Sequence, residues 1–194
     1  MERNELYPIF LKVSELNVLL VGGGNVGLEK LTFLLKSSPR AKVLAVAPEF
    51  LPATVELAQK HEVEMLSEPY HSRHLQGKHM VIACTDSPSV NQEVYRDCRE
   101  RSILVNVADN PPFCDFYMGG IVTKGHVKVA ISTNGKSPTT AKRLRQFFED
   151  VIPEDIDELV KNLNTYRKGL KGSFEDKVHT LNEVTKGLID KALK

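Results

Sequence analysis

Residues 22–27 (Gly-Gly-Gly-Asn-Val-Gly) follow an apolar stretch with the spacing of a phosphate-binding turn. In such a turn Gly22 allows a tight bend, Gly24 lets bare backbone approach a pyrophosphate, and Gly27 lets the next helix pack closely. The amides at the start of that helix have no acceptor within it and can face phosphate oxygens. Glycines also make ordinary tight turns, so a purely structural role stays open. With an apolar strand before it and an amphipathic helix after it, the turn predicts a dinucleotide, here a nicotinamide cofactor.

Polar residues also follow the second and fourth predicted strands. Glu49 lies where an acidic residue takes the ribose hydroxyls of a dinucleotide, although a solvated loop carboxylate explains it equally well. No arginine immediately follows that strand to pair with a 2′-phosphate, which favours NAD over NADP. Thr85 and Asp86 either face the cofactor or belong to an ordinary helix entry.

Asp109 is the main candidate for a catalytic residue. It lies on a turn after the fifth predicted strand, among apolar residues and prolines that would restrict its movement. A carboxylate held there can accept a proton. The alternative is an Asx turn formed with residues 110–111.

Positive charge gathers in the second half of the chain, although the net charge of the whole chain is only +1. Lys124 and His126 belong to a predicted hairpin turn, and Ser137, Thr139 and Lys142 open a predicted helix. Free amides, hydroxyls and cations together predict a site for an anionic substrate. A solvated helix face accounts for the same residues, so both interpretations stay open.

The composition argues against several other classes of function. A near-neutral chain has no field to attract nucleic acid or an anionic membrane, and no apolar stretch is long enough to span a bilayer. The three cysteines have no CxxC spacing and the six histidines form no HExxH motif, so the sequence predicts no metal site. An odd number of cysteines without a disulfide pattern suits a reducing cytoplasm.

The elements that must position these residues alternate between short apolar runs and longer helical patterns, which is typical of a Rossmann-like parallel α/β sheet. The predicted strands are residues 17–21, 43–47, 63–66, 80–84 and 103–107. The predicted helices between them are residues 25–36, 52–60 and 89–100. Ligands are expected at the carboxyl edge of such a sheet.

Beyond residue 114 the pattern changes to two successive strands, 120–123 and 127–132, and then to helices. We expect an NAD-binding domain over 1–114, a small α+β dimerisation module over 115–150 and a helical region over 151–194. The helices are predicted over about 137–150, from 153 to about 169, and over 174–193. Apolar surface on the second and third parts predicts a homodimer.

Several motifs together resemble the siroheme-synthase amino-terminal family. They are Pro8-Ile9-Phe10, residues 21–27, Ala83-Cys84-Thr85-Asp86, Val90-Asn91, Asn106-Val107-Ala108-Asp109 and residues 132–138. The resemblance runs from about residue 7 to residue 145. It implies a precorrin-2 dehydrogenase, in some members also a sirohydrochlorin ferrochelatase, and the form without a methyltransferase region.

The resemblance also implies roles for particular residues. NAD contacts fall on Asn25, Val26, Pro48 and Glu49, and Asp109 acts in dehydrogenation and chelation. Precorrin-2 carries eight carboxylates, which the basic region would hold. This chain departs from the family at two positions. Gly27 stands where the family often has alanine, and Thr133 stands where some members have a serine that is phosphorylated.

Two other classes of function stay open on the sequence. One is a regulatory module that binds NAD and reports its redox state without catalysis. The other is an oxidoreductase for a different anionic substrate.

Overall fold

The computed structural model describes residues 3–187, which form two compact units. Within the described residues, the first unit comprises residues 3–119 with Ser132–Pro138, and the second comprises Gly120–Ile131 with residues 139–187. The loop before the fourth helix therefore belongs to the first unit. The division into 1–114, 115–150 and 151–194 stays a prediction.

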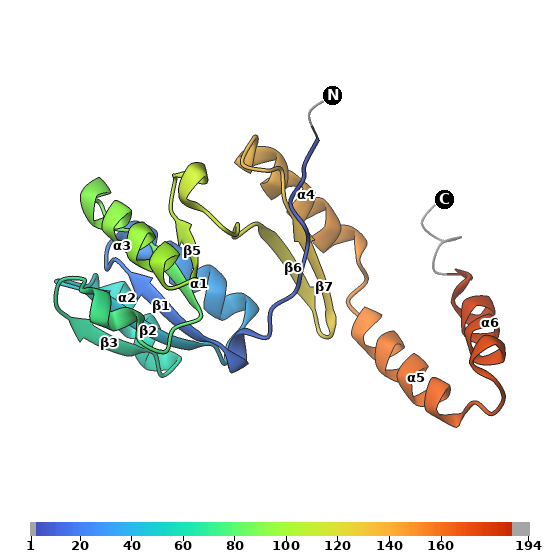
Figure 1. Cartoon of the computed structure of the whole chain (residues 1–194). Coiled ribbons are helices and arrows are strands. Elements are labelled where there is room, and N and C mark those ends of the chain that lie inside the picture. Colours follow the sequence, from blue (N-terminus) through green and yellow to red (C-terminus); the bar gives the residue numbers. More distant parts are fainter. Residues whose placement is uncertain (1–2, 188–194) are drawn as a thin grey trace. The chain divides into compact units, whose positions relative to one another are not determined.

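The first unit contains a five-stranded parallel sheet with the strand order β3-β2-β1-β4-β5 (Figure 1). Its strands are β1 (Asn17–Val21), β2 (Lys42–Ala47), β3 (Glu64–Ser67), β4 (Met80–Ala83) and β5 (Leu104–Val107). Its helices are α1 (Asn25–Ser37), α2 (Pro52–Lys60) and α3 (Pro88–Glu100). Three short 3-10 helices, η1 (Val13–Glu15), η2 (Ser72–Leu75) and η3 (Pro111–Phe113), were not predicted. The Rossmann-like fold expected from the sequence is confirmed, with strand ends within one or two residues of the predictions.

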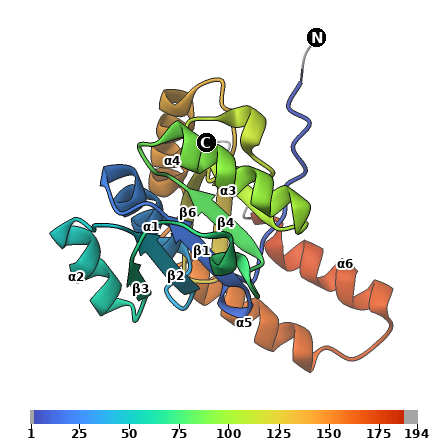
Figure 2. The ribbon, with the colours of Figure 1, turned by 60° about the vertical axis from the view of Figure 1, so that its left-hand side comes forward.

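The two faces of this sheet bury alternate residues of each strand, as the two-residue period of a strand requires. Val18 and Leu20 of β1 pack under α1 and α2, whereas Leu19 and Val21 pack on the α3 side. Figure 2 shows α1 and α2 on one side of the sheet and α3 on the other. Because both faces are covered, the central strands β1, β2 and β4 are apolar after Asn17 and Lys42 rather than alternating.

The second unit contains an antiparallel hairpin followed by three helices. The elements are β6 (Gly120–Lys124), β7 (Val127–Ile131), α4 (Pro138–Val151), α5 (Ile156–Gly169) and α6 (Phe174–Thr185). Gly125, with a φ of 57°, supplies the left-handed first position of the two-residue turn between the strands. The expected final helix begins as predicted at Phe174, and its part from residue 188 lies outside the described residues.

Few side chains of the second unit are buried. Val122 is 2% exposed, and it is the one buried residue among the described residues of this unit. Helices α4, α5 and α6 contain no buried residue. In the part of the chain that the structure describes, no helix is long and apolar enough to cross a membrane.

Candidate functional site

The glycine turn joins β1 to α1 and leaves room only at one of its glycines. A Cβ on Gly22, whose φ is 131°, would lie 2.6 Å from the carbonyl oxygen of Cys84. A Cβ on Gly27 would lie 2.2 Å from the carbonyl oxygen of Gly22. A Cβ on Gly24 would meet nothing within 4 Å. The tight bend, the close helix packing and the open approach fit the three roles that a dinucleotide turn requires.

Helix α1 presents its amino terminus at this open point. Gly24 is the N-cap and carries no side chain, and its carbonyl accepts the amide hydrogen of Leu28 at 2.9 Å. Asn25 and Val26, the predicted contacts, are exposed in the first turn. The first amides of a helix lack acceptors within it, so they can bind a pyrophosphate here.

The loop after β2 lies directly against the glycine turn. A Cβ on Gly23 would lie 2.0 Å from the carbonyl oxygen of Glu49, and the Leu51 amide donates to the Gly23 carbonyl at 3.1 Å. Pro48 and Glu49 are exposed beside this contact. The predicted ribose-binding residue and the predicted phosphate-binding turn are therefore neighbours. Sequence reasoning assigned no role to Gly23, whose need for a bare Cα becomes visible only in the fold.

Thr85, after β4, is bonded mainly to Asn91 of α3. The Asn91 Oδ1 accepts from the Thr85 amide at 3.1 Å and from its hydroxyl at 2.8 Å, and the Asn91 Nδ2 donates to the Thr85 carbonyl at 3.0 Å. Ser87 caps α3 by accepting from the Val90 amide. The helix-entry interpretation of this stretch is thus observed, and cofactor binding by Thr85 stays a prediction.

Asp109 is exposed at the carboxyl end of β5, in a left-handed conformation with a φ of 57°. For a residue with a Cβ this conformation costs about 1 kcal/mol. Within residues 3–187 its carboxylate has no hydrogen-bond partner, so the Asx-turn alternative is not observed. The turn is instead closed by the backbone, because the Asn110 amide donates to the Val107 carbonyl at 3.2 Å.

The chain then returns along the outer side of β5. The Asp115 amide donates to the Val105 carbonyl at 2.8 Å, and its Oδ2 accepts from the Val105 amide at 3.0 Å. Its Oδ1 accepts from the Arg99 guanidinium at 2.8 Å. Both ends of the loop that carries Asp109 are thereby attached to the same strand.

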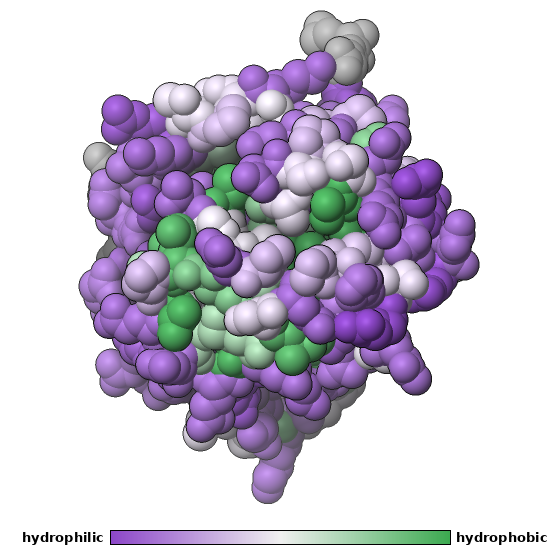
Figure 3. Space-filling model, turned by 90° about the vertical axis from the view of Figure 1, so that its left-hand side faces the viewer, coloured by the Kyte–Doolittle hydropathy of each residue, from purple (hydrophilic) through white to green (hydrophobic). Residues whose placement is uncertain are grey.

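The glycine turn, the 48–49 loop, Thr85 and Asp109 follow β1, β2, β4 and β5, which are neighbours in the parallel sheet. They therefore share its carboxyl edge, where open α/β sheets bind ligands. Figure 3 views the molecule from the side on which α2 and α3 lie in Figure 1, and hydrophobic residues gather there within a hydrophilic surround.

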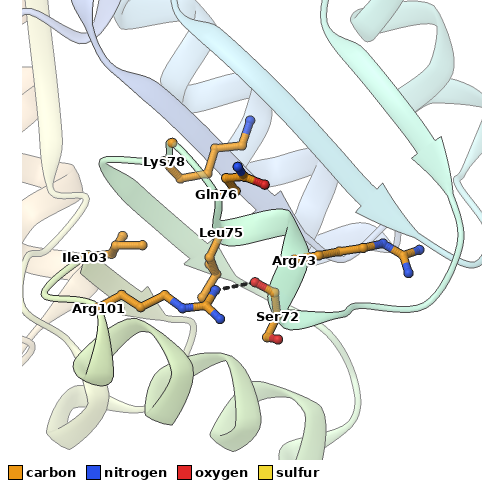
Figure 4. A pocket seen from close by; sticks show the side chains of 8 residues that line it. Ser72, Arg73, Leu75, Gln76, Lys78, Arg101 and Ile103 are labelled. Carbon is orange, nitrogen blue, oxygen red and sulfur yellow. Dashed lines mark hydrogen bonds between the residues drawn. The ribbon is translucent and has the colours of Figure 1, made fainter.

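A cavity of about 680 Å³ lies at the opposite, amino edge of the sheet. Its lining includes Arg101, whose guanidinium donates to the Ser72 carbonyl, together with Lys78 and Ile103, which precede β4 and β5 (Figure 4). No residue that the sequence predicts for cofactor or substrate binding lines this cavity.

The two hairpin residues of the predicted basic region are bonded to acidic side chains of their own unit. Lys124 pairs with Glu154, and the Nδ1 of His126 lies 2.6 Å from the Oδ1 of Asp157. The Nζ of Lys161 lies 2.7 Å from the other oxygen of Asp157. Hydrogen bonds from Lys161 and His126 hold the pKa of Asp157 well below its usual range. Substrate binding by Lys124 and His126 stays a prediction and would compete with these pairs.

The loop before α4 is a structured turn. Asn134 and Gly135 both have positive φ, and the Lys136 amide donates to the Thr133 carbonyl at 3.0 Å, as in a type I′ turn. The Thr133 hydroxyl donates to the Ser137 carbonyl at 3.1 Å and accepts from its amide at 3.3 Å. The remaining predicted substrate contacts on this helix, Thr139 and Lys142, are exposed. They belong to the second unit, whereas Ser137 belongs to the first.

The cysteines are free thiols, and burial raises the pKa of Cys84 and of Cys98 to about 12. No group of three or more potential metal ligands occurs among the described residues.

Comparison with known proteins gives two family matches along the chain. Residues 9–120 match a family described as putative NAD(P)-binding, and residues 124–150 match the central part of sirohaem biosynthesis proteins. A siroheme synthase of Pseudoalteromonas translucida is 38% identical over 168 residues, and one of Chromobacterium violaceum is 35% identical over 172 residues. These alignments cover 87% and 89% of this chain but 35% and 36% of the relatives, so the chain spans about a third of their length.

Among solved structures, SirC, a precorrin-2 dehydrogenase, superposes with a TM-score of 0.72. The match covers 92% of this chain and 89% of SirC at 23% sequence identity. The fold therefore has a known counterpart over 92% of the chain.

Proposed function

We propose that this chain oxidises precorrin-2 to sirohydrochlorin with a nicotinamide cofactor. The chain belongs to the putative NAD(P)-binding family and is 38% identical to part of a siroheme synthase. The observation that carries this proposal is the exposed carboxylate of Asp109, which has no partner within residues 3–187 and lies on the same sheet edge as a glycine turn with room for a pyrophosphate. SirC, which shares the fold, is named a precorrin-2 dehydrogenase.

The residues present fit the cofactor. The open space at Gly24 and the amides of Asn25 and Val26 would hold the pyrophosphate, and the exposed Glu49 would accept hydrogen bonds from the ribose hydroxyls. We propose NAD rather than NADP, because a carboxylate at this position would repel a 2′-phosphate. When bound, the nicotinamide supplies the hydride acceptor.

The reaction removes one hydride and one proton from precorrin-2. Asp109 would accept the proton, since its carboxylate has no competing partner among residues 3–187 and its turn is fixed by the backbone. Ser137, Thr139 and Lys142, with Lys124 and His126, would hold carboxylates of the substrate. The same Asp109 could relay protons from the pyrrole nitrogens if Fe²⁺ is inserted afterwards.

The decisive experiment replaces Asp109 with alanine and follows NADH and sirohydrochlorin formation by absorbance. We expect kcat to fall by roughly 10²- to 10⁴-fold, the usual contribution of general acid–base catalysis, while NAD⁺ binding by calorimetry is unchanged. Glu93→Ala, which removes an exposed carboxylate of α3, is the matched control. Unchanged turnover in Asp109→Ala would refute the assignment, and wild-type protein that binds NAD⁺ without turnover would indicate the regulatory alternative.

We further propose a cytoplasmic homodimer formed through the second unit. Leu144, Phe147 and Val151 lie on one face of α4 and are 39%, 56% and 53% exposed. An apolar stripe of this kind is more often covered by a partner than left in water. Sedimentation should show a dimer that Phe147→Glu disrupts and that Phe33→Glu, at an exposed site of α1, leaves intact. A wild-type monomer at micromolar concentration would contradict the proposal.

A further inference from the structure

Asn106 is a polar side chain in an otherwise apolar strand. It is 7% exposed, between the buried residues Val105 and Val107 of β5. Burial of an amide is unfavourable unless its hydrogen bonds are made. Its Nδ2 donates to the Phe116 carbonyl at 2.7 Å and lies 3.4 Å from the Sγ of Cys114. The amide therefore attaches the returning chain, residues 114–116, to the strand from which the Asp109 loop departs.

Cys114 extends this attachment into the loop itself. Its Sγ lies 3.2 Å from the Val107 carbonyl and 3.3 Å from the Asn110 carbonyl, the two residues that flank the turn at Asp109. Burial raises the pKa of the Cys114 thiol, so the S–H group is retained near neutral pH and can donate. One side chain thus contacts the backbone before and after the candidate catalytic residue.

An aromatic contact fixes the far side of the same loop. The rings of Phe113, in η3, and Tyr95, in α3, stack with centroids 4.4 Å apart and planes inclined by 18°. The Phe113 amide donates to the Asn110 carbonyl at 3.0 Å. The loop is held on one side by β5 and on the other by α3.

Asp109 itself makes none of these contacts, yet its left-handed conformation needs support from its surroundings. We propose that Asn106 and Cys114 are positioning residues, which fix the Asp109 turn so that its carboxylate is correctly placed for proton transfer. This inference rests on the proposed function, because it assigns the two residues to the same reaction.

The test compares Cys114→Ala, which removes the donor, with Cys114→Ser, which retains one. We expect Cys114→Ala to lower kcat by about 10- to 100-fold, the effect of displacing a catalytic group by about 1 Å, with KM for NAD⁺ and precorrin-2 within about twofold of wild type. Cys114→Ser should recover most of the activity. Cys98→Ala, which removes a buried thiol of α3 outside this loop, should lower thermal stability without changing kcat.

Two further measurements separate positioning from a general structural role. Amide hydrogen exchange at Asn110 and Phe113 should accelerate in Cys114→Ala and not in Cys98→Ala, whether or not substrate is present. In an Asp109→Ala background, Cys114→Ala should cause no additional loss of kcat, because it acts through the missing carboxylate.

Normal kcat in Cys114→Ala, unchanged exchange at both amides, or an additive loss in the double variant would each overturn the positioning role. If Asp109→Ala itself remains active, the proposed function fails instead. The exchange experiment would still report whether the thiol fixes the loop, so the two failures are distinguishable.

Discussion

Replacement of Gly24 and of Gly23 by alanine should separate cofactor binding from folding within one turn. At Gly24 the new Cβ enters open space, and the φ of −82° suits alanine. Alanine reduces the freedom of the unfolded chain, which stabilises the folded state by roughly 0.4–1 kcal/mol, and the weaker N-cap destabilises it by a similar amount. We therefore expect the melting temperature to change by less than about 2 °C.

The same methyl group occupies the space through which a pyrophosphate would approach the helix amides. Loss of one hydrogen bond to a charged group costs about 1.5–3 kcal/mol, so the Kd for NAD⁺ should rise roughly 10- to 100-fold. At Gly23 the Cβ would lie 2.0 Å from the Glu49 carbonyl oxygen and 2.9 Å from the Ala47 Cβ. Overpacking of this kind costs about 1–3 kcal/mol, which should lower the melting temperature by about 3–10 °C.

Scanning calorimetry without ligand and titration calorimetry with NAD⁺ measure the two effects independently. Gly24→Ala should lose affinity and keep its stability, whereas Gly23→Ala should lose stability. Wild-type affinity in Gly24→Ala would show that the pyrophosphate does not approach this glycine. A wild-type melting temperature in Gly23→Ala would show that the contact with the 48–49 loop is not rigid.

Three other perturbations follow from contacts in the two units. Glu49→Ala should weaken NADH binding by about tenfold while affinity for NADPH is retained or rises, measured by fluorescence titration of the two reduced cofactors; an equal loss for both would contradict the ribose role. Asn91→Ala should lower the free energy of unfolding, measured by urea denaturation, by about 1–3 kcal/mol, because three hydrogen bonds to Thr85 are lost. Replacement of the exposed Asn162 by alanine should leave this free energy unchanged. The pKa of Asp157 is lowered in the folded state, so its stabilising contribution is complete above its ordinary value of 3.8 and is lost as the pH falls below it. Circular dichroism at pH 2–6 should show a smaller acid-induced loss of stability in Asp157→Asn, and identical profiles would refute this.

The sequence predicted the sheet well because strands buried on both faces are short apolar runs, and each ends at a glycine, proline or polar turn. It also predicted the glycine turn, since the spacing of Gly22, Gly24 and Gly27 is local. The role of Gly23 could not be predicted, because its restriction comes from a carbonyl group 26 positions later, at Glu49.

The basic region shows a second limit of sequence reasoning. The sequence predicts Lys124 and His126 as contacts for an anionic substrate, and it does not reveal their partners Glu154 and Asp157, which lie about 30 residues further along the chain. An acidic first turn of α5 was the available signal, since it includes Asp157 and Glu158. The sequence places Asn106 in a strand and in a family motif, and only the returning chain gives its amide a partner.

The segment that returns along β5 has a consequence for contacts between separate molecules. A strand at the border of a sheet exposes amide and carbonyl groups that a strand of another chain can pair with, which is a common route to aggregation. Here the amide and carbonyl groups of Val105 that face away from β4 are hydrogen-bonded to Asp115, and the Val107 carbonyl is hydrogen-bonded to the Cys114 thiol. Intermolecular sheet growth at this border would first require residues 114–115 to detach. The loop that presents Asp109 therefore also protects the molecule against association through β5, which lies at one border of the sheet.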